Sequence, residues 1–309
     1  MNITVLSIVI FVIASTEALS PQTVEVDYSE LANEAENNKK HLLEFLNQTQ
    51  VRELYRTKYN ILLDKITGSS RRIVSGQNTS ITAVPWQVSL WYITEFGCAG
   101  SVVTDIWILT AAHCLERFKA KDLSVRVGSS WRTHGGEMYD VKESYMHPQY
   151  DTKHLLNDAG LLRLYTTLRF SSRVLPILLA ARDSRLPANQ MAIVSGWGNM
   201  KEKGQFATFL QSASIRTIVM KLCRQSEVDR GIDPASMFCA GSFTQPSPDS
   251  CQGDSGGPIV SEGFLIGAVS WGKGCARGNF PGVYTRLSDP DIWDWIYGHL
   301  TRQDTNVNI

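Results

Sequence analysis

The sequence has no excess of either charge, because 30 Lys and Arg residues balance 30 Asp and Glu residues among its 309. A chain without a basic surplus lacks the electrostatic signature of binding to nucleic acid or to an anionic surface. It has no internal repeat, no metal-ligand cluster and, beyond its first 18 residues, no apolar run near the about 20 residues of a transmembrane helix. We therefore expect neither nucleic acid nor a membrane as partner, and no metal ion or cofactor.

Cysteine is scarce, at six residues, and all six lie beyond residue 97. An even number favours complete pairing in an oxidising compartment, with many connectivities open. The N-terminus is consistent with such a compartment, because an apolar run from Val5 to Ala14 ends in small and polar residues. We interpret residues 1–18 as a secretory signal peptide cleaved after Ala18 or, alternatively, after Ala14, although no Lys or Arg precedes the apolar run. The mature protein is therefore expected to be secreted and extracellular.

Residues 19–72 contain no cysteine, and no glycine precedes Gly68. Apolar residues recur there at spacings of 4, 4, 3 and 4, which is typical of an amphipathic helix: Val51, Tyr55, Tyr59, Leu62 and Ile66. Gly68-Ser69-Ser70 then breaks the pattern into an exposed, cleavable linker. The charges of the segment are mixed, so we expect it to pack on the rest of the chain or on a helical partner rather than on lipid.

The most informative stretch is Asp249 to Pro258, which reads D-S-C-Q-G-D-S-G-G-P. Glycines around Ser255 let the backbone turn tightly and direct successive N–H groups at one point, as the binding of an oxyanion requires. Ser255 is then the candidate nucleophile. A lone G-D-S-G can equally be an ordinary turn, so its interpretation depends on other residues.

Two other residues complete a catalytic pattern. His113 stands in T-A-A-H-C and Asp158 in N-D-A-G-L-L-R-L, where a buried charge needs a partner. Alone, the first could be a structural His at a strand end and the second a turn or helix-capping Asp. In the order His, Asp, Ser, and with the glycine-rich loop, they resemble the chymotrypsin-like serine proteases over residues 73 to about 300.

This resemblance implies an all-β fold of two packed six-stranded β-barrels with a C-terminal helix, here preceded by a helical propeptide. It also implies that Ser255 attacks the peptide carbonyl, that His113 serves as base and then acid, and that Asp158 orients His113. Backbone N–H groups of Gly253 and Ser255 would form the oxyanion hole. Ser270 matches the residue that hydrogen-bonds the catalytic Asp.

The same resemblance implies a preference for substrates with Arg or Lys before the cleaved bond. Asp249 matches the residue at the bottom of the primary pocket, where a buried carboxylate selects a cation. Ser250 would help to bind Lys, and the remaining matching positions are the pocket walls Gly272 and Gly282, the neighbouring wall Trp271 and the entrance residue Gln252.

The segment R-R-I-V-S-G matches the activation site of the family. Cleavage after Arg72, by the enzyme itself or by another protease, would free the amino group of Ile73 to pair with Asp254. The chain would then be a zymogen with a signal peptide at 1–18, a propeptide at 19–72 and a trypsin-like protease domain at 73–309. Family register also implies three disulfides, Cys98–Cys114, Cys223–Cys239 and Cys251–Cys275.

Two positions depart from the family pattern. Phe96 stands where the family often has a His that helps to hold the zymogen inactive. Gly160 replaces a common Ala in a buried strand, at an expected cost of about 1 kcal/mol.

Further expectations concern local structure and partners. Strand-like runs cover Gln87 to Tyr92, Val102 to Leu109 and Ile193 to Ser195, and a helix is predicted from Pro290 with Ile292, Trp295 and Ile296 on one face. Asn47 and Asn78 lie in glycosylation motifs. We expect a monomer that acts on protein or peptide substrates and meets an activating protease and protein inhibitors. The alternative is a catalytically inactive homologue that serves as a binding or regulatory module.

Overall fold

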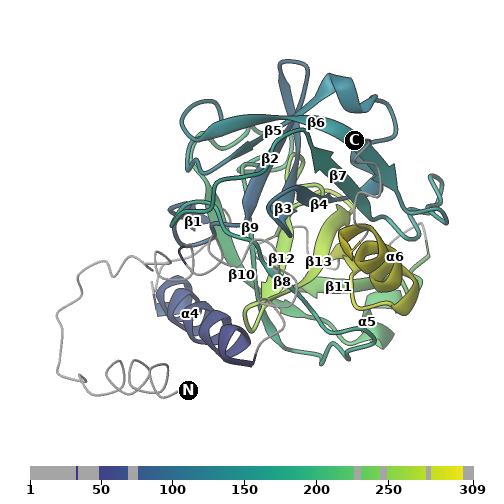
Figure 1. Ribbon diagram of the computed structural model, residues 1–309. Helices are drawn as coiled ribbons and strands as arrows, with labels where there is room; N and C mark the ends of the chain where they lie inside the picture. Colours follow the sequence, from purple (N-terminus) through teal and green to yellow (C-terminus); the bar gives the residue numbers. More distant parts are fainter. Residues whose placement is uncertain are drawn as a thin grey trace, which may run out of the picture.

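The computed structural model describes residue 33 and residues 49–68, 76–225, 231–243, 249–275 and 280–301. Two β-barrels make up most of this part of the chain, with one helix before them and one after them in sequence (Figure 1). None of the helices in these ranges has the length and apolar character needed to cross a membrane.

The first barrel is closed by six antiparallel strands in the order β2-β3-β4-β7-β6-β5. Its strands are β2 (Gln87–Tyr92), β3 (Glu95–Val102), β4 (Trp107–Thr110), β5 (Leu123–Val127), β6 (Glu137–Met146) and β7 (Gly160–Leu164). Strand β5 alternates buried and half-buried residues along its length, as expected when one face of a strand packs on a core. Short 3₁₀ helices at Ala112–Cys114 and Ala120–Asp122 join β4 to β5.

The second barrel closes through the pairings β9–β10, β10–β11, β11–β14, β14–β13, β13–β12 and β12–β9. Its strands are β9 (Met191–Gly196), β10 (Gln211–Thr217), β11 (Met237–Gly241), β12 (Pro258–Ser261), β13 (Phe264–Trp271) and β14 (Gly282–Arg286). Two short strands attach to its edges, β1 (Gln77–Asn78) to β10 and β8 (Leu178–Leu179) to β13. The chain therefore has the two six-stranded barrels that the sequence implied.

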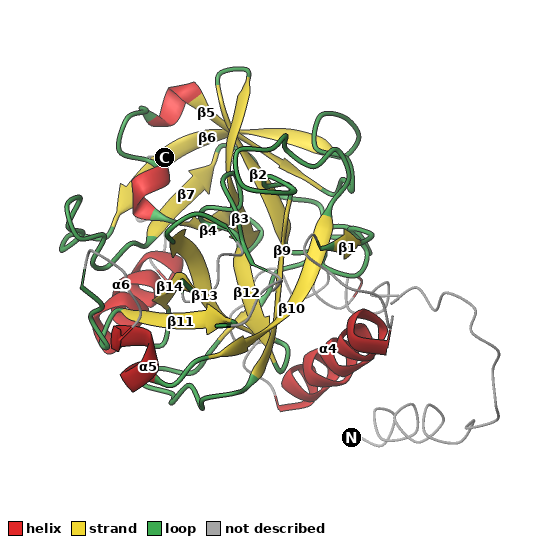
Figure 2. Cartoon of the chain, turned by 180° about the vertical axis from the view of Figure 1, so that it is seen from behind, coloured by secondary structure: helices red, strands yellow, loops and turns green. Residues whose placement is uncertain are grey.

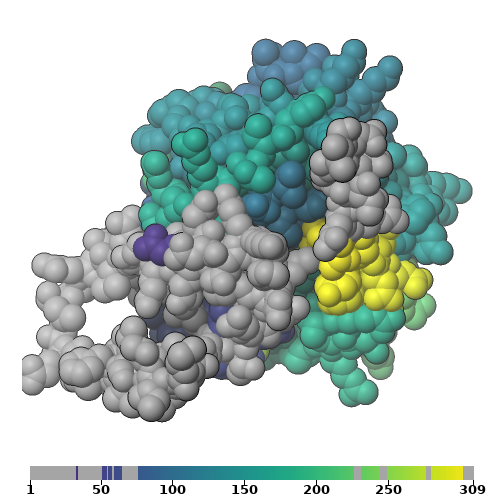
Figure 3. Space-filling view, viewed as in Figure 1, coloured from purple at the N-terminus to yellow at the C-terminus, as the bar shows by residue number. Residues whose placement is uncertain are grey.

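In the described part of the chain, three α-helices lie outside the barrels: α4 (Thr49–Gly68), α5 (Met220–Gln225) and α6 (Pro290–Thr301). Helix α6 begins at the predicted Pro290 and fully buries Ile292 and Ile296. Its other end reaches the first barrel, because the His299 ring lies 4.5 Å from that of Tyr145 on β6. The C-terminal residues, yellow in Figure 3, accordingly lie at the surface between teal residues of the first barrel and green residues of the second.

One predicted strand was wrong. The run from Val102 to Leu109 is split between β3 and β4 by a turn at residues 103–106. The Thr104 hydroxyl accepts hydrogen bonds from the backbone N–H groups of Ile106 and Trp107, at 3.2 and 3.1 Å. These side-chain contacts stabilise the turn, and an apolar run alone does not reveal them.

Candidate active site

The candidate base and its orienting acid come from the first barrel. His113 lies in the 3₁₀ turn directly after β4, and Asp158 lies two residues before β7. The Asp158 carboxylate accepts two hydrogen bonds from His113, one from the backbone N–H at 2.9 Å and one from Nδ1 at 2.8 Å. Asp158 is only 1% exposed, so these charge-assisted bonds act in a medium that screens them weakly. With a proton on Nδ1, Nε2 is the nitrogen of a neutral His113 that can accept one.

The second barrel supports the same carboxylate. Ser270, on β13, donates its hydroxyl to Asp158 Oδ2, the oxygen that also contacts His113. Thr285, on β14, donates to the Asp158 backbone carbonyl at 2.7 Å. Ser270 was expected from the family resemblance, but Thr285 was not, because nothing local to Thr285 indicates a contact 127 residues away. The position of Asp158 therefore depends on both barrels.

The Ser255 loop packs directly on the first barrel. The Ser255 carbonyl accepts a hydrogen bond from Ala99 N–H of β3 at 2.8 Å. The next residue, Gly256, has φ +75°, and a Cβ there would lie 2.1 Å from Thr110 Oγ1 and 2.6 Å from the Ala99 carbonyl. Only glycine fits both this backbone conformation and this close approach. The glycine-rich loop is thus needed for the contact between barrels as well as for its own turn.

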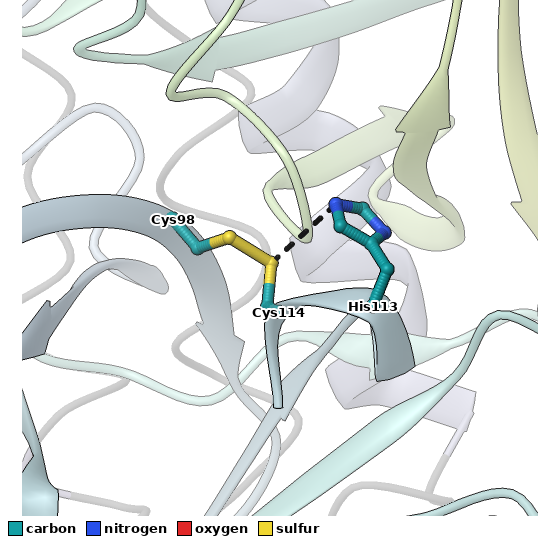
Figure 4. Close-up of side chains that lie close together, drawn as sticks. All are labelled: Cys98, His113 and Cys114. Carbon is teal, nitrogen blue, oxygen red and sulfur yellow. Dashed lines mark hydrogen bonds between the residues drawn. A yellow bond between two sulfur atoms is a disulfide. The ribbon is translucent and has the colours of Figure 1, made fainter. Parts of the chain in front are cut away.

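A disulfide lies beside both candidate catalytic groups. Cys114 Sγ is 3.7 Å from His113 Nε2, as Figure 4 shows, and it is also 3.7 Å from the Ser255 carbonyl oxygen. With Cys98, these residues bring three potential metal-binding atoms within 4.8 Å of one another. The two sulfurs are bonded to each other in the Cys98–Cys114 disulfide, however, so neither is a thiolate that could hold a metal. The cluster is better explained as a brace for the candidate base His113.

Gly253, the candidate oxyanion-hole residue, has φ +96° and packs against aromatic side chains. A Cβ at this position would lie 2.7 Å from the ring of Phe206 and 3.1 Å from that of Phe96. The two rings meet edge to face at 5.1 Å, and the Arg132 guanidinium lies 5.5 Å from each. Phe206 could not be predicted from the sequence, because it stands in a loop far from Gly253 along the chain.

The residues of the expected primary pocket are also brought together. Asp249 Oδ1 lies 3.0 Å from the place where a Cβ of Gly282 would be, whereas a Cβ on Gly272 would meet no atom nearer than 3.8 Å. The Ser250 and Tyr284 hydroxyls are 3.2 Å apart, and burial together with the nearby Asp249 charge raises the pKa of Tyr284. Tyr284 therefore stays a neutral hydroxyl. The Cys251–Cys275 disulfide links the loop that carries Asp249 and Ser250 to the segment that follows β13. Trp271 is the last residue of β13. Gln252, expected at the pocket entrance, is exposed.

Asp254, next to Ser255 in sequence, lines a cavity of about 330 Å³ together with Gly76, Gly196 and Gly198. Its carboxylate accepts hydrogen bonds from the N–H groups of Gly198 at 2.8 Å and Cys251 at 3.0 Å. Burial nevertheless raises its pKa to about 6, because two neutral donors do not replace the lost hydration. A Cβ on Gly196 or Gly198 would lie 2.1 or 2.3 Å from this carboxylate, so both of these positions in the cavity wall must be glycine.

Some expected residues lie outside the described ranges: residues 1–18, Asn47, and the activation residues Arg72 and Ile73. Asn78 is described, and it is exposed on β1, where its side chain accepts a hydrogen bond from Gln211 at 2.8 Å. The remaining disulfide, Cys223–Cys239, joins α5 to β11.

Two closed six-stranded barrels, with His and Asp from one barrel facing a G-D-S-G loop of the other, define a chymotrypsin-like serine endopeptidase. The comparison with known proteins specifies the family. Residues 73–296 match the model of the Trypsin family, and the chain belongs to that family.

Curated relatives agree over most of their length. Trypsin delta of Drosophila erecta is 39% identical over 234 residues, covering 75% of this chain and 89% of the relative. A trypsin of Simulium vittatum is 40% identical over 69% of this chain and 87% of its own. The vitellin-degrading protease of Bombyx mori is 36% identical over 74% of this chain and 86% of its own. The protein is thus a trypsin-like serine protease that acts on protein substrates.

Proposed function

We propose that this protease is a secreted zymogen that, once activated, cleaves peptide bonds after Arg or Lys. Residues 1–18 would be the signal peptide, 19–72 the propeptide and 73–309 the protease domain. The observation that carries the catalytic part of this proposal is the hydrogen-bond network of Asp158. Its carboxylate accepts hydrogen bonds from His113 of the first barrel and from Ser270 of the second. A binding module without catalysis would have no need of this network, so the inactive-homologue alternative is not favoured.

The proposed reaction has two steps. Ser255 Oγ attacks the substrate carbonyl carbon while His113 Nε2 takes the hydroxyl proton, and the N–H groups of Gly253 and Ser255 receive the oxyanion. His113 then returns the proton to the leaving amine as the peptide C–N bond breaks. A water molecule, deprotonated by His113, then attacks the acyl carbonyl carbon. The ester bond to Ser255 breaks, and His113 returns the proton to Ser255 Oγ. Asp158 remains ionised throughout and stabilises the charged imidazole.

The proposed specificity rests on Asp249. A substrate guanidinium or ammonium entering between Gly272 and Gly282 would pair with this carboxylate, and the charge pair would offset the desolvation of both groups. Ser250 would add a hydroxyl for the compact ammonium of Lys. Trp271 would flank the residues before the cleaved bond, with Gln252 at the entrance.

Activation is proposed to proceed by cleavage after Arg72. The new Ile73 ammonium would then enter the cavity lined by Asp254 and pair with its carboxylate. The raised pKa of Asp254 supports this proposal, since it marks a buried acid whose ionised form gains from a cation. The proposed partners are an activating protease, which can be the enzyme itself, and protein inhibitors, and N-glycans are proposed at Asn47 and Asn78.

The test is hydrolysis of matched peptide amides with Arg, Lys, Phe or Ala before the cleaved bond. The chain and its Ser255→Ala variant are opened after Arg72 by an immobilised protease, which is then removed. We expect turnover of the Arg and Lys amides alone and none by the variant, whose treated sample also controls for carried-over protease. No turnover of any amide, with a free Ile73 amine verified by N-terminal sequencing, would contradict the proposal.

A further inference from the structure

Helix α4 precedes the protease domain in sequence, yet one of its faces belongs to the protein core. Four of its side chains are 2–4% exposed and are part of a hydrophobic cluster that continues into the first barrel: Val51, Tyr55, Tyr59 and Leu62. The opposite face is exposed at Glu53, Arg56, Thr57, Asn60 and Ile61. The helix lies beside β10, as both ribbon views show (Figures 1 and 2).

Both tyrosines of α4 end in hydrogen bonds to the backbone of the protease domain. Tyr55 donates its hydroxyl to the Pro176 carbonyl, and Tyr59 donates to the Met191 carbonyl at 2.9 Å. Burial raises the pKa of Tyr59 to about 12, so its hydroxyl remains a donor at any physiological pH. A buried hydroxyl that keeps its partner fixes the helix in one position as well as adding affinity.

The hairpin that joins β12 to β13 receives the helix backbone. Its two turn residues, Glu262 and Gly263, have φ +51° and +82°. A Cβ on Gly263 would lie 2.6 Å from the Tyr55 carbonyl carbon and 2.8 Å from Arg56 N. Glycine thus permits the close approach of helix and turn. Next to it, the Arg52 guanidinium lies 4.5 Å from the centre of the Phe264 ring, a cation–π contact.

We infer that helix α4 stays bound to the protease domain after activation, as a second and non-covalent chain of the mature enzyme. This inference rests on the proposed cleavage after Arg72. That cut lies beyond the helix and removes none of the contacts just described. Its effect is to remove the covalent tether, which lowers the effective concentration of the helix at its binding surface. Its partner residues Pro176, Met191 and Ser261–Phe264 are separate from the candidate active site, so a bound helix leaves that site open.

The test begins with the full chain, cut after Arg72 and passed through a size-exclusion column at about 1 µM. We expect the fragment that carries residues 49–68 to elute with the protease domain, and mass spectrometry under denaturing conditions to resolve two chains. Elution of the protease domain without the fragment would overturn the inference. If Arg72 resists cleavage, a site for a sequence-specific protease inserted after Gly68 gives the same measurement.

Three variants test the contacts themselves. Tyr59→Phe removes one hydrogen bond and should weaken retention about 5-fold, whereas Tyr55→Ala should weaken it at least about 100-fold. Gly263→Asn keeps a residue that tolerates positive φ but places a side chain against the helix, so retention should fall at least about 10-fold in a folded domain. Asn60→Ala, on the exposed face, is the matched control and should leave retention unchanged. Equal retention in all four variants would contradict the assigned interface.

Amide hydrolysis measured on the same fractions separates this inference from the proposed function. An inactive sample that retains the fragment would support the inference that α4 stays bound and refute the proposed catalysis. An active sample that has lost the fragment would support the proposed catalysis and refute the inference.

Discussion

At the scale of single residues, the candidate site depends on how fully one buried carboxylate is hydrogen-bonded. Asp158 is 1% exposed and contacts His113 twice and Ser270 once. A buried anion loses most of its hydration, so each donor that replaces water stabilises the charged form. The donors come from two barrels, so the position of this carboxylate depends on contacts in both.

Ser270→Ala should reduce kcat/KM by about 10- to 100-fold, because a hydrogen bond to a charged group contributes about 1.5–3 kcal/mol. The measurement is amide hydrolysis by the activated protein, with thermal unfolding to verify the fold. Ser124→Ala, on β5 of the first barrel, is the matched control. Unchanged kcat/KM in the Ser270 variant would show that His113 and its own contacts suffice to hold Asp158.

Asp249→Ser should reduce turnover of Arg and Lys amides by about 10²- to 10⁴-fold, because it leaves the substrate cation buried without a partner. Turnover of an Ala amide should change far less. Asp183→Asn removes an acid whose side chain is 72% exposed, and it should affect neither substrate. Equal losses on Arg and Ala amides would indicate a general defect instead of a change in specificity.

Residues with a motif of their own were predictable, and residues defined by long-range contacts were not. The loop at Asp249 to Pro258 carries its own glycine pattern, so Ser255 could be found without a structure. Thr285 and Phe206 carry no such pattern, since each acts on a residue distant in sequence. Local propensity contains no information about such pairs.

At the scale of elements, strong periodicity was a reliable guide. The 3.6-residue pattern predicted α4 and α6, whose buried faces are the predicted ones where they are described. Two turns were not predicted from the sequence: the two-residue hairpin turn of Glu262 and Gly263, and the turn that separates β3 from β4. Both are decided by single turn residues rather than by a repeating pattern.

Strand β7 shows why a glycine can be required where a side chain is expected. Gly160 pairs with Thr110 and lies against the preceding 3₁₀ turn, and a Cβ would come within 2.8 Å of Leu115 Cδ1 and 3.0 Å of the Ala111 carbonyl. Leu115 is 4% exposed and occupies this space. The stability that an Ala at position 160 would be expected to add is therefore offset by its clash with Leu115 and the Ala111 carbonyl.

Gly160→Ala should destabilise the protein by about 1–3 kcal/mol, measured as the free energy of unfolding in denaturant. Adding Leu115→Val should recover part of the loss. Gly298→Ala, in helix α6 where a Cβ would meet nothing within 4 Å, should instead stabilise by about 0.4–1 kcal/mol. A stabilising Gly160→Ala would mean that Leu115 moves aside at little cost.

At the scale of the whole molecule, helix α6 links the two halves of the fold. Trp293 donates a hydrogen bond to the Ala180 carbonyl at 3.1 Å, while Trp295 packs its ring 5.2 Å from that of His147, just after β6. His147 is 4% exposed, and burial lowers its pKa against the smaller opposing effects of Asp291 and Asp289. Protonation of His147 is therefore coupled to the docking of α6.

The contribution of His147 to the free energy of unfolding should fall as the pH drops below about 6.5, where an unfolded His binds a proton that the folded His147 resists. Above that pH both states are neutral at this residue, and the effect vanishes. His147→Gln should flatten this part of the pH dependence in denaturant titrations between about pH 5 and 8. His134→Gln, at an exposed position, should leave it intact. An identical slope in both variants would exclude His147 as its source.

The position of α4 also affects how the protein is made. Tyr59 finds its partner Met191 across 132 residues, and the hairpin at Gly263 follows later still. At a synthesis rate of about 5–20 residues per second, the apolar face of this helix waits on the order of ten seconds for its binding surface. The segment synthesised among the first is thus among the last to be packed, and until then its apolar face is exposed to chaperones and to aggregation.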